Sequence, residues 1–545
     1  TVRSEALETE ISLPNFRQGD AIILYERNSD TDNVTNKMVF KGNIEYLTEN
    51  EIGIRLRATQ QNPSVLPAES LYAIEHDTMD TTFRSMYQGL YIYLSARKER
   101  RDLLLSQRPP RFDESLDSMI SRSEDDFTRI ALKAKAAQDY FLLIGPPGTG
   151  KTSCALKKMV ETFHADKDAQ ILLLSYTNRA VDEICKSLAS IDPAVDFIRV
   201  GSELSCDEAY RGHLIENELS SCNRRSEVYE RIRNCRIIVG TVAAISGKPE
   251  LFRLKHFDVA IIDEATQILE PQLLGILCAR GEDGKDAIDK FVLIGDHKQL
   301  PAVVQQNTEQ SAIYDESLLS IGLANLKDSL FERLYRNCTA TVHRSYDMLC
   351  RQGRMHPEVA LFANRAFYGG RLIPVGLPHQ IESSDTICRL AFYPSVPEKA
   401  GASAKINYSE ARIVADLAAR IYEDHQTDFD ESRTLGIITP YRSQIALIKK
   451  EIESLGIPAL NRILVDTVER FQGSERDVII YSFCVNYPYQ LKFLSNLTEE
   501  EGVLIDRKLN VALTRARKQM FITGVPELLE RNPLYKSLLK LIESF

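Results

Sequence analysis

The residues that most clearly carry chemistry lie in a glycine-rich turn. They are Gly145, Pro146, Pro147, Gly148, Thr149, Gly150, Lys151 and Thr152. Glycines let the backbone curl until successive N–H groups point at phosphate oxygens, while a lysine and a hydroxyl reach the terminal phosphates and Mg²⁺. The apolar run YFLLI precedes the turn, and the helix-compatible run SCALKKMVETF follows it. Strand, turn and helix in that order predict a site for a nucleoside triphosphate with Mg²⁺.

Further polar groups follow apolar runs downstream of this turn. Asp263 and Glu264 end the run VAIIDE, and Gln299 comes shortly after FVLIGD. An aspartate there can hold Mg²⁺ beside Thr152, and a glutamate can orient or deprotonate water for attack on a terminal phosphate. Alone, each is a common strand end or polar loop. Behind a phosphate-binding turn, they predict that Lys151, Glu264 and Gln299 are catalytic.

Short continuous apolar runs, typical of buried parallel strands, occur in two groups. The first group lies between 140 and 296 and consists of YFLLIG, ILLLSY, RIIVGT, VAIIDE and FVLIGD. The second lies between 433 and 524 and consists of RTLGIITP, RILVDTV, DVIIYSF and QMFITG. Helix-compatible segments separate the runs, so each group predicts a doubly wound α/β domain. Because the glycine-rich turn occurs in the first group alone, we expect the nucleotide between the two domains.

The chain ahead of these domains has a different pattern. Short β-type runs (DAIILY, MVFKGNI and IGIRLRA) within 11–82 alternate with Asp, Asn and Gly turns and predict a small β-barrel or sheet. One long amphipathic helix is predicted over 82–106. The predicted organisation is a β-barrel domain (1–82), a helical stalk (83–125), a first α/β domain (126–330) with a short helical insertion at about 203–234, and a second α/β domain (331–545).

Composition limits the class of protein. The 545 residues carry a net charge of −10, which argues against a uniformly basic nucleic-acid coat protein but leaves room for a local basic groove. The ten cysteines show no zinc-type spacing and predict reduced thiols. No apolar run approaches the ~18 residues of a membrane span, and nothing resembles a signal peptide. We expect a cytoplasmic protein, associated with the nucleoid if bacterial; a nuclear location is compatible with the same features.

Six motifs in order resemble those of the superfamily 1B helicases. They are GPPGTGKT, DEATQ, GDHKQLP, RQGRMHP (351–357), VDTVERFQGSERDVII (465–480) and LNVALTRAR (509–517). This 5′→3′ branch includes the nonsense-mediated-decay RNA helicase and the Okazaki-fragment nuclease-helicase. The resemblance implies two RecA-like domains, ATP and Mg²⁺ as ligands, and movement along single-stranded nucleic acid. The predicted barrel and stalk are similar to the accessory elements of that branch.

The resemblance also implies roles for residues of the second domain. Arg354 and Arg515 match the two arginines that reach the γ-phosphate, where a guanidinium delivered across a cleft stabilises the charge of phosphoryl transfer. Arg517 fits that role and a surface cation equally well. Glu475 resembles the glutamate near the nucleotide sugar and phosphates, and a solvated loop acid is the alternative.

By the same resemblance, nucleic acid lies across both domains. The matching residues are Thr177, Asn178, Thr241, Thr439, Pro440 and Thr467. Hydroxyls, amides and backbone N–H groups there would hold phosphates without reading sequence. Taken singly, each is better explained as a turn or helix-capping residue, so the prediction depends on the surrounding motifs.

Two departures from the family pattern concern the nucleobase. Gly353 stands where the family usually has an aromatic residue that stacks on the base. The glutamine that reads adenine upstream of the glycine-rich turn has no clear match, since Thr128 lies near the expected place and Gln138 lies too close. We therefore expect loose selectivity among nucleobases.

Two readings of the function remain open. The first is an ATP-driven translocase that unwinds duplexes, and the second is a nucleotide-dependent clamp or remodeller that unwinds poorly. A small-molecule kinase is disfavoured by the second sheet without a phosphate-binding turn and by the paired arginines. Residues 76–112 loosely resemble the nuclease-helicase side of the branch, which favours DNA over RNA as the single-stranded partner. No nuclease motif occurs here, so a nuclease would be an upstream domain or a separate partner.

Overall fold

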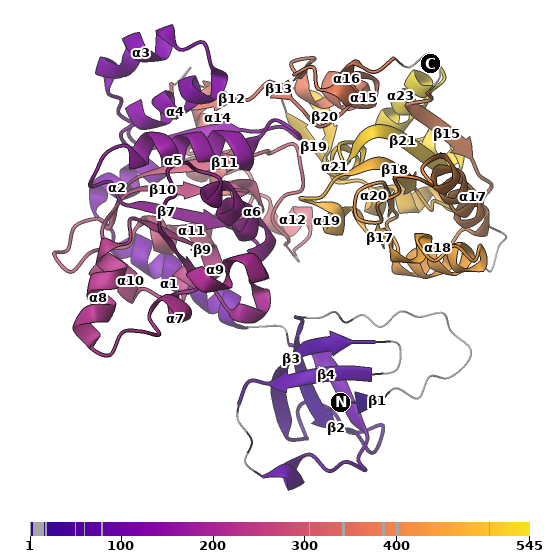
Figure 1. Cartoon of the computed structure of the whole chain (residues 1–545), viewed down its shortest axis with the longest axis horizontal. Coiled ribbons are helices and arrows are strands. Elements are labelled where there is room, and N and C mark those ends of the chain that lie inside the picture. Colours follow the sequence, from indigo (N-terminus) through magenta and orange to yellow (C-terminus); the bar gives the residue numbers. More distant parts are fainter. Residues whose placement is uncertain are drawn as a thin grey trace.

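The structure, a computed structural model, describes residues 2–3, 16, 19–48, 51–58, 60, 62–77, 80–304, 306–340, 344–383, 387–398, 403–500 and 502–544. Two α/β lobes lie side by side, and a small N-terminal β-domain lies apart from them (Figure 1). We call the lobe that contains the glycine-rich turn domain 1 and the other lobe domain 2.

Domain 1 is built on a seven-stranded parallel sheet. Its strands are β6 (Tyr140–Ile144), β7 (Ile171–Ser175), β8 (Phe197–Val200), β9 (Ile237–Thr241), β10 (Phe257–Ile262), β11 (Ile288–Gly295) and β12 (Tyr346–Met348). The order across the sheet is β12-β6-β11-β10-β7-β9-β8, and every neighbouring pair is parallel. The five runs predicted as strands are confirmed. Their Val, Ile and Leu side chains are buried because helices cover both faces of the sheet.

Domain 2 has a five-stranded parallel sheet. Its strands are β15 (Leu390–Pro394), β16 (Leu435–Ile438), β17 (Leu464–Asp466), β18 (Arg476–Ser482) and β21 (Ala516–Gly524). The order is β15-β21-β18-β16-β17. An antiparallel hairpin joins β19 (Leu497–Glu500) to β20 (Val503–Asp506), and β13 (Arg351–Gln352) pairs with β14 (Ile373–Pro374). The predicted fold class, two doubly wound parallel-sheet domains, is confirmed.

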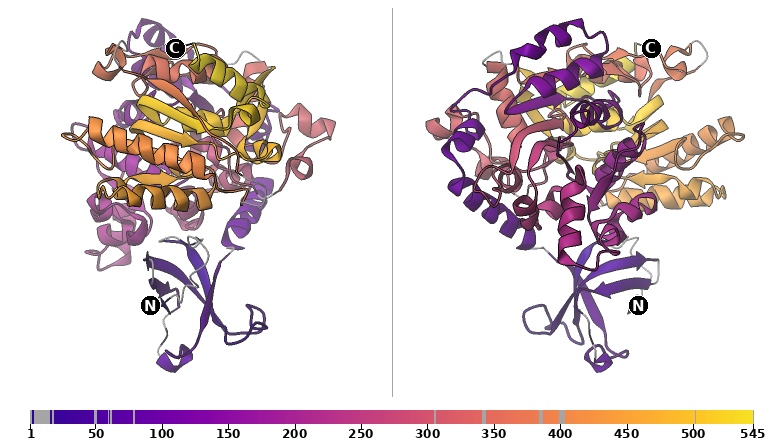
Figure 2. Two further views of the ribbon diagram at one scale, coloured as in Figure 1. Left: turned by 90° about the vertical axis from the view of Figure 1, so that its right-hand side faces the viewer. Right: turned by 60° about the vertical axis from the view of Figure 1, so that its left-hand side comes forward.

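Helices pack against each sheet, and the left view of Figure 2 shows the orange helices on the near side of domain 2, beside its yellow strands. Domain 1 contains α4 (Asp126–Ala136), α5 (Lys157–His164), α6 (Asn178–Ala189), α7 (Ile215–Glu218), α8 (Arg225–Asn234), α9 (Val242–Ser246), α10 (Glu250–Leu254), α11 (Glu270–Leu277), α12 (Thr308–Ser311), α13 (Glu316–Ser320) and α14 (Leu330–Ala340). Domain 2 contains α15 (Pro357–Tyr368), α16 (Pro378–Ile381), α17 (Tyr408–Asp424), α18 (Arg442–Ser454), α19 (Val468–Phe471), α20 (Leu491–Leu494), α21 (Arg507–Leu513), α22 (Pro526–Leu529) and α23 (Pro533–Ile542). Within the described ranges, no helix has the length and apolar character to cross a membrane.

The N-terminal β-domain is a five-stranded antiparallel sheet. Its strands are β1 (Val2–Arg3), β2 (Ala21–Glu26), β3 (Val39–Leu47), β4 (Glu51–Leu56) and β5 (Tyr72–His76), in the order β1-β4-β3-β2-β5. Its buried cluster is small and is formed by Ile22, Leu24, Phe40 and Ile44. Of the two forms predicted for this part of the chain, a barrel or a sheet, the described residues form a sheet with β1 and β5 at its edges.

The stalk is two helices, and the prediction of one long helix over 82–106 is wrong. The structure has α1 (Asp80–Ser95) and α2 (Lys98–Leu104), followed by α3 (Asp117–Arg122). Arg97 has extended backbone angles, so the chain turns between α1 and α2. The turn buries Arg100, whose guanidinium donates to the carbonyl oxygen of Asp289 at 3.1 Å. This tertiary contact outweighs the helical propensity of the segment.

The predicted boundary between the two α/β domains at 330/331 is also wrong. β12 pairs with β6 and extends the sheet of domain 1. Leu330, Phe331 and Leu334 of α14 belong to the hydrophobic cluster of domain 1. The crossing to domain 2 therefore follows Met348. The sequence signal is weak here because β12 has three residues and they are only half-buried.

Two further strands were not expected from apolar runs. In β8, Arg199 interrupts the run although the side chain is 1% exposed, and its charge is paired with Asp182 from α6. β15 is an edge strand in which only Leu390 is buried. The predicted helical insertion at 203–234 corresponds to α7, α8 and short 3₁₀ turns between β8 and β9.

The packing of α1 on α11 leads to a stability prediction. A Cβ atom at Gly89 would lie 2.3 Å from the carbonyl oxygen of Pro271, so the two helices touch through backbone. Gly89→Ala should lower the free energy of unfolding of domain 1 by about 1–3 kcal/mol, although alanine favours a helix by about 1 kcal/mol. Gly212→Ala, where nothing lies within 4 Å, is the control in thermal unfolding. Equal stability of the two variants would contradict the packing argument.

Candidate functional site

The glycine-rich turn connects β6 to a π-helical turn over Lys151–Leu156 and then to α5. Gly148 and Gly150 have φ values of +73° and +75°, a backbone conformation that L side chains rarely adopt. A Cβ atom at Gly145 would lie 2.0 Å from Cγ of Lys151. These glycines are therefore required by the shape of the turn. Its N–H groups and the helix that follows suit the phosphates of a nucleotide.

The acidic pair predicted at the end of β10 faces this turn. The Thr152 hydroxyl donates to Asp263 Oδ2 at 2.5 Å, and the Lys151 ammonium contacts Glu264 Oε1 at 3.1 Å. Gln267 donates to the other Glu264 oxygen at 2.8 Å. The hydroxyl and carboxylate oxygens of Thr152 and Asp263 are the ligand type that Mg²⁺ prefers, so these two residues fit an Mg²⁺ site.

Burial and mutual charge set the ionisation of these groups. Burial, aided by the Glu264 carboxylate, raises the pKa of Asp263 to about 6. Burial opposes the charged form of Lys151, but Glu264 and Asp263 outweigh it and raise the pKa of the ammonium. Burial likewise opposes the charged form of Glu264, and the Lys151 cation outweighs it, so the pKa of Glu264 is lowered. At neutral pH the site therefore presents a cation and a carboxylate side by side.

Gln299 connects the two domains. Its amide donates to Asp296 Oδ2 at 2.7 Å, and its carbonyl oxygen accepts from Arg515 of domain 2 at 3.3 Å. The Tyr368 hydroxyl of domain 2 also donates to Asp296 Oδ2, at 2.7 Å. Asn510 donates to the Tyr368 oxygen at 2.8 Å and to the Lys298 carbonyl at 2.7 Å. Domain 2 thus holds the loop that follows β11 by several buried hydrogen bonds.

The predicted arginines reach the same place from domain 2. Arg515 is 2% exposed, and burial, aided by the nearby Arg354 cation, lowers the pKa of Arg515 to about 9, so it remains a cation at neutral pH. Arg354 lies directly against the glycine-rich turn, since a Cβ atom at Gly148 would be 2.4 Å from its Cβ. Its guanidinium donates to Glu475 at 2.5 Å. Arg517 also reaches the space between the domains, where it pairs with Asp477 at 2.9 Å and lies 3.7 Å from Glu475.

One cavity of about 2120 Å³ lies between the domains and brings most of the predicted residues together. Those that line it are Pro146, Pro147, Gly148, Thr149, Gly150, Lys151, Thr152, Thr177, Asp263, Glu264, Gln299, Arg354, Glu475 and Arg515. In domain 1 the residues predicted to bind the nucleotide follow β6, β11 and β10, which are adjacent strands in the sheet. Parallel strands end at one edge, so residues far apart in sequence meet there.

The residues predicted to contact nucleic acid follow other strands. Thr177 and Thr241 come at the ends of β7 and β9, and both hydroxyls accept from a helix N–H group, at 3.2 and 3.1 Å. Asn178 opens α6, after the capping Thr177. Although both cap helices, Thr177 is exposed and lines the cavity, whereas Thr241 is only 7% exposed.

In domain 2, Pro440 follows β16 and is half-buried, and Thr467 follows β17. Thr439 is fully buried, so the surface of that loop is formed by Pro440 rather than by the Thr439 hydroxyl. Their contact with nucleic acid remains a prediction.

Sequence reasoning missed three residues of the interdomain site. Tyr368 and Asn510 are described above, and Phe127 lines the cavity beside the glycine-rich turn, where a Cβ atom at Gly150 would lie 3.5 Å from its ring. A Cβ atom at Gly353 would lie 3.4 Å from Val375, which also lines the cavity, so that side of the cavity is bordered by an aliphatic residue. The only local sign of Phe127 was its place ahead of β6.

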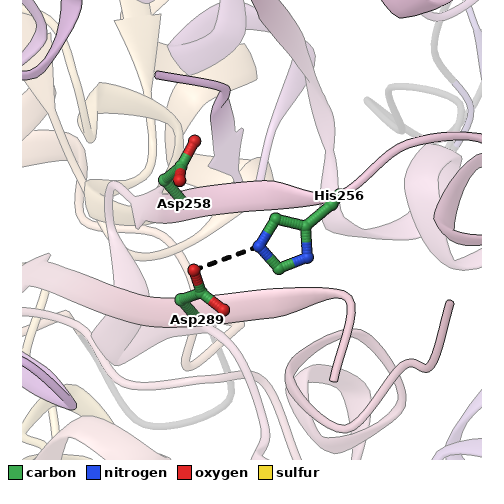
Figure 3. A group of neighbouring side chains, drawn as sticks. All are labelled: His256, Asp258 and Asp289. Carbon is green, nitrogen blue, oxygen red and sulfur yellow. Dashed lines mark ion pairs between the residues drawn. The ribbon is translucent and has the colours of Figure 1, made fainter. Parts of the chain in front are cut away.

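A second group of side chains of the type that binds metals lies at the other end of the domain 1 strands, away from the glycine-rich turn. His256, Asp258 and Asp289 stand at the amino ends of β10 and β11 (Figure 3). His256 and Asp289 form an ion pair at 3.0 Å, and both side chains are about half exposed. Asp258 accepts from the Gln170 N–H group at 2.7 Å. These contacts account for the group as surface polar packing, and we assign no metal to it.

Comparison with known proteins identifies the family. Two protein-family models, both described as AAA domain, match residues 122–228 with 216–307 and residues 326–527. The chain is 27% identical over 593 residues to "DNA replication ATP-dependent helicase/nuclease DNA2" of Bos taurus, an alignment that covers 98% of this chain and 50% of that protein. This chain is a homologue of the Dna2-like and Upf1-like superfamily 1 helicases. The predicted family is confirmed.

Two other relatives define the extent of the match. The chain is 27% identical over 584 residues to "DNA replication ATP-dependent helicase/nuclease JHS1" of Arabidopsis thaliana, covering 99% of this chain and 40% of that protein. It is 24% identical over 536 residues to "DNA polymerase alpha-associated DNA helicase A" of Saccharomyces cerevisiae, covering 84% and 73%. The chain therefore spans about half the length of the first two relatives. Among solved structures, "Complex structure of Arterivirus nonstructural protein 10 (helicase) with DNA" matches with a TM-score of 0.37 and 15% identity, over 76% of this chain and 65% of that one.

The geometry predicts separate effects on nucleotide binding and turnover. Glu264→Gln should lower the rate of ATP hydrolysis by roughly 10²–10⁴-fold, because the amide cannot accept a proton from water. Nucleotide binding should persist, since Thr152 and Asp263 are unchanged. Phosphate release and binding of a fluorescent ATP analogue measure the two effects, with Glu316→Gln on the exposed surface of α13 as the control. Near-normal turnover in Glu264→Gln would remove the glutamate from the reaction.

A second prediction concerns the contact between Tyr368 and Asp296. Tyr368→Phe removes a charge-assisted hydrogen bond of about 1.5 kcal/mol and should lower the turnover number by roughly tenfold, with little change in nucleotide affinity. Tyr535→Phe is the matched control, since the Tyr535 hydroxyl donates to Asp506 at 2.8 Å in the interior of domain 2. Steady-state ATPase assays and thermal unfolding of both variants decide the matter. Equal turnover in the two variants would reduce Tyr368 to a stabilising residue.

Proposed function

We propose that this chain hydrolyses ATP between its two α/β domains and uses the cycle to move 5′→3′ along single-stranded DNA and unwind duplexes. The observation that carries the proposal is the hydrogen bond from Arg515 of domain 2 to Gln299 of domain 1, inside the cavity that also contains Lys151 and Glu264. A group from one domain reaches the reaction site of the other. Hydrolysis and the relative position of the domains are therefore coupled.

Each residue has a part in the proposed reaction. When bound, ATP would supply the phosphoanhydride bond that is hydrolysed, and Mg²⁺ would neutralise part of the negative charge of the phosphates. The glycine-rich turn and Lys151 would hold the phosphates, and Thr152 and Asp263 would hold the metal. Glu264 orients water and accepts its proton, while Gln299 positions that water. Arg354 and Arg515 stabilise the charge that develops on the phosphoryl oxygens.

The grip on the strand comes from both domains. Thr177, Asn178 and Thr241 serve domain 1, and Pro440 and Thr467 serve domain 2. Contacts to phosphates make such a grip salt-sensitive and largely independent of sequence. When the domains close on the nucleotide, the strand contacts of one domain move relative to those of the other. Hydrolysis then allows the domains to separate again. This gives a step along the strand.

DNA is favoured as the strand because the relatives are named as DNA replication helicase/nucleases and a DNA helicase. RNA is the alternative substrate, since discrimination depends on contacts to the 2′-OH. The relatives extend well beyond the span of this chain, so a nuclease activity would come from a further domain or a partner. A nucleotide-dependent clamp that unwinds poorly is the second candidate, and the unwinding assay below separates it.

The polarity and substrate are tested with duplexes that carry a single-stranded tail. We expect ATP-dependent unwinding of a DNA duplex with a 5′ tail, weaker unwinding of the RNA version, and none with only a 3′ tail. Strand separation is followed by fluorescence, and the Glu264→Gln variant is the control. Unwinding of the 3′-tailed duplex alone would overturn the polarity, and faster unwinding of RNA would overturn the substrate. ATP hydrolysis that is stimulated by single strands without unwinding of any duplex would favour the clamp.

A further inference from the structure

The segment between β18 and β19 carries exposed aromatic rings beside the loop predicted to contact nucleic acid. β18 pairs with β16 in parallel, with Tyr481 opposite Ile438. The chain beyond β18 therefore leaves the sheet at the same edge as Pro440. The buried Gln490 amide fastens the two segments, because it donates to the Tyr441 hydroxyl at 3.2 Å.

Two of these rings are exposed on a fixed scaffold. Tyr489 is 54% exposed and Phe493 is 70% exposed. The Gln490 carbonyl oxygen accepts from the N–H groups of Asn486 and Tyr487, both at 2.9 Å. The Tyr487 and Tyr489 rings are stacked with centroids 5.8 Å apart and 14° between their planes. Hydrogen bonds and stacking thus fix the segment that carries Tyr489 and the orientation of its ring.

The short helix α20 turns Phe493 outward. Leu491 and Leu494 are buried at 9% and 2% exposure and anchor the helix in the domain 2 cluster. Lys492 and Phe493, between them, are left on the surface. Lys492 lines the interdomain cavity, as do Arg470 and, from domain 1, Lys186. Lys492 therefore places a cation beside the exposed Phe493, which suits an anionic partner with flat apolar groups.

We infer that Tyr489 and Phe493 form a stacking surface for the unpaired bases of the strand that this chain binds. The inference rests on the proposed function and adds a contact that the threonine and proline positions cannot make. Those positions reach phosphates, which are the same in single strands and duplexes. The face of a base is free for an aromatic ring only where the strand is unpaired, so the surface selects single strands without reading sequence.

The test compares a single-stranded DNA oligonucleotide with an otherwise identical strand that lacks bases. We expect the whole protein to bind the base-containing strand more tightly. Tyr489→Ala and Phe493→Ala should each weaken binding of that strand by about tenfold, with unchanged affinity for the abasic strand and unchanged ATP hydrolysis without nucleic acid. Phe493→Trp should retain the binding of wild type. Tyr314→Ala, at an 81% exposed tyrosine of domain 1, is the control.

The outcomes separate this inference from the proposed function. If the variants lose affinity equally for both strands, or if wild type binds both strands equally while single strands still stimulate its ATP hydrolysis, the stacking surface is overturned and the proposed function stands. If wild type binds neither strand, both fail. Fluorescence anisotropy gives the affinities. A 2-aminopurine base in the strand gives a second signal, since its fluorescence should be quenched by wild type and not by Phe493→Ala.

Discussion

The buried Arg515 guanidinium is the constraint on which the rest of the site depends. It is 2% exposed and donates to Gln299 of domain 1 and to the Val511 and Ser474 carbonyl oxygens of domain 2. A buried cation is costly unless it is paired and hydrogen-bonded. The Glu264 carboxylate of domain 1 is among the charges that favour its ionised form. Domain 1 therefore completes the environment of a charge that domain 2 carries, which ties the candidate reaction site to the position of domain 2.

The loop after β11 extends this dependence beyond one arginine. His297 pairs with Glu500 of the β19–β20 hairpin at 2.9 Å, and Lys298 donates to the Phe367 carbonyl at 2.9 Å. Nearby, Arg507 of domain 2 pairs with the buried Glu332 of α14. Because these contacts surround Gln299, a movement of domain 2 would change the position of a residue predicted to be catalytic. The loop is thus the physical link between the candidate reaction site of domain 1 and domain 2.

How far the sequence could predict this site depends on the range of each signal. The glycine-rich turn and Asp263-Glu264 were predictable, because parallel strands bring their carboxyl ends to one edge. Arg515 required the family resemblance, since no spacing rule links it to Gln299, 216 residues away. Tyr368 meets Asp296 across 72 residues and lacks any local pattern that marks it. The fold shows the same limit: apolar runs predicted the central strands, whereas β8 was hidden by Arg199, whose burial depends on its partner in α6.

The second sheet separates the two groups of predicted site residues in domain 2, those for the nucleotide and those for nucleic acid, by the length of a strand. Glu475 and Arg515 precede β18 and β21 and meet the nucleotide cavity at the amino ends of these strands. Pro440 and Thr467 follow β16 and β17 at the carboxyl ends. The seven residues of β18 span about 23 Å. A rotation of about 10° about the arginine end would move the far end of the strands by about 4 Å, close to the axial rise of roughly 3.4 Å per nucleotide of one strand in B-form DNA. A rigid sheet held at its nucleotide end can thus convert a small closure into a displacement on the scale of one nucleotide.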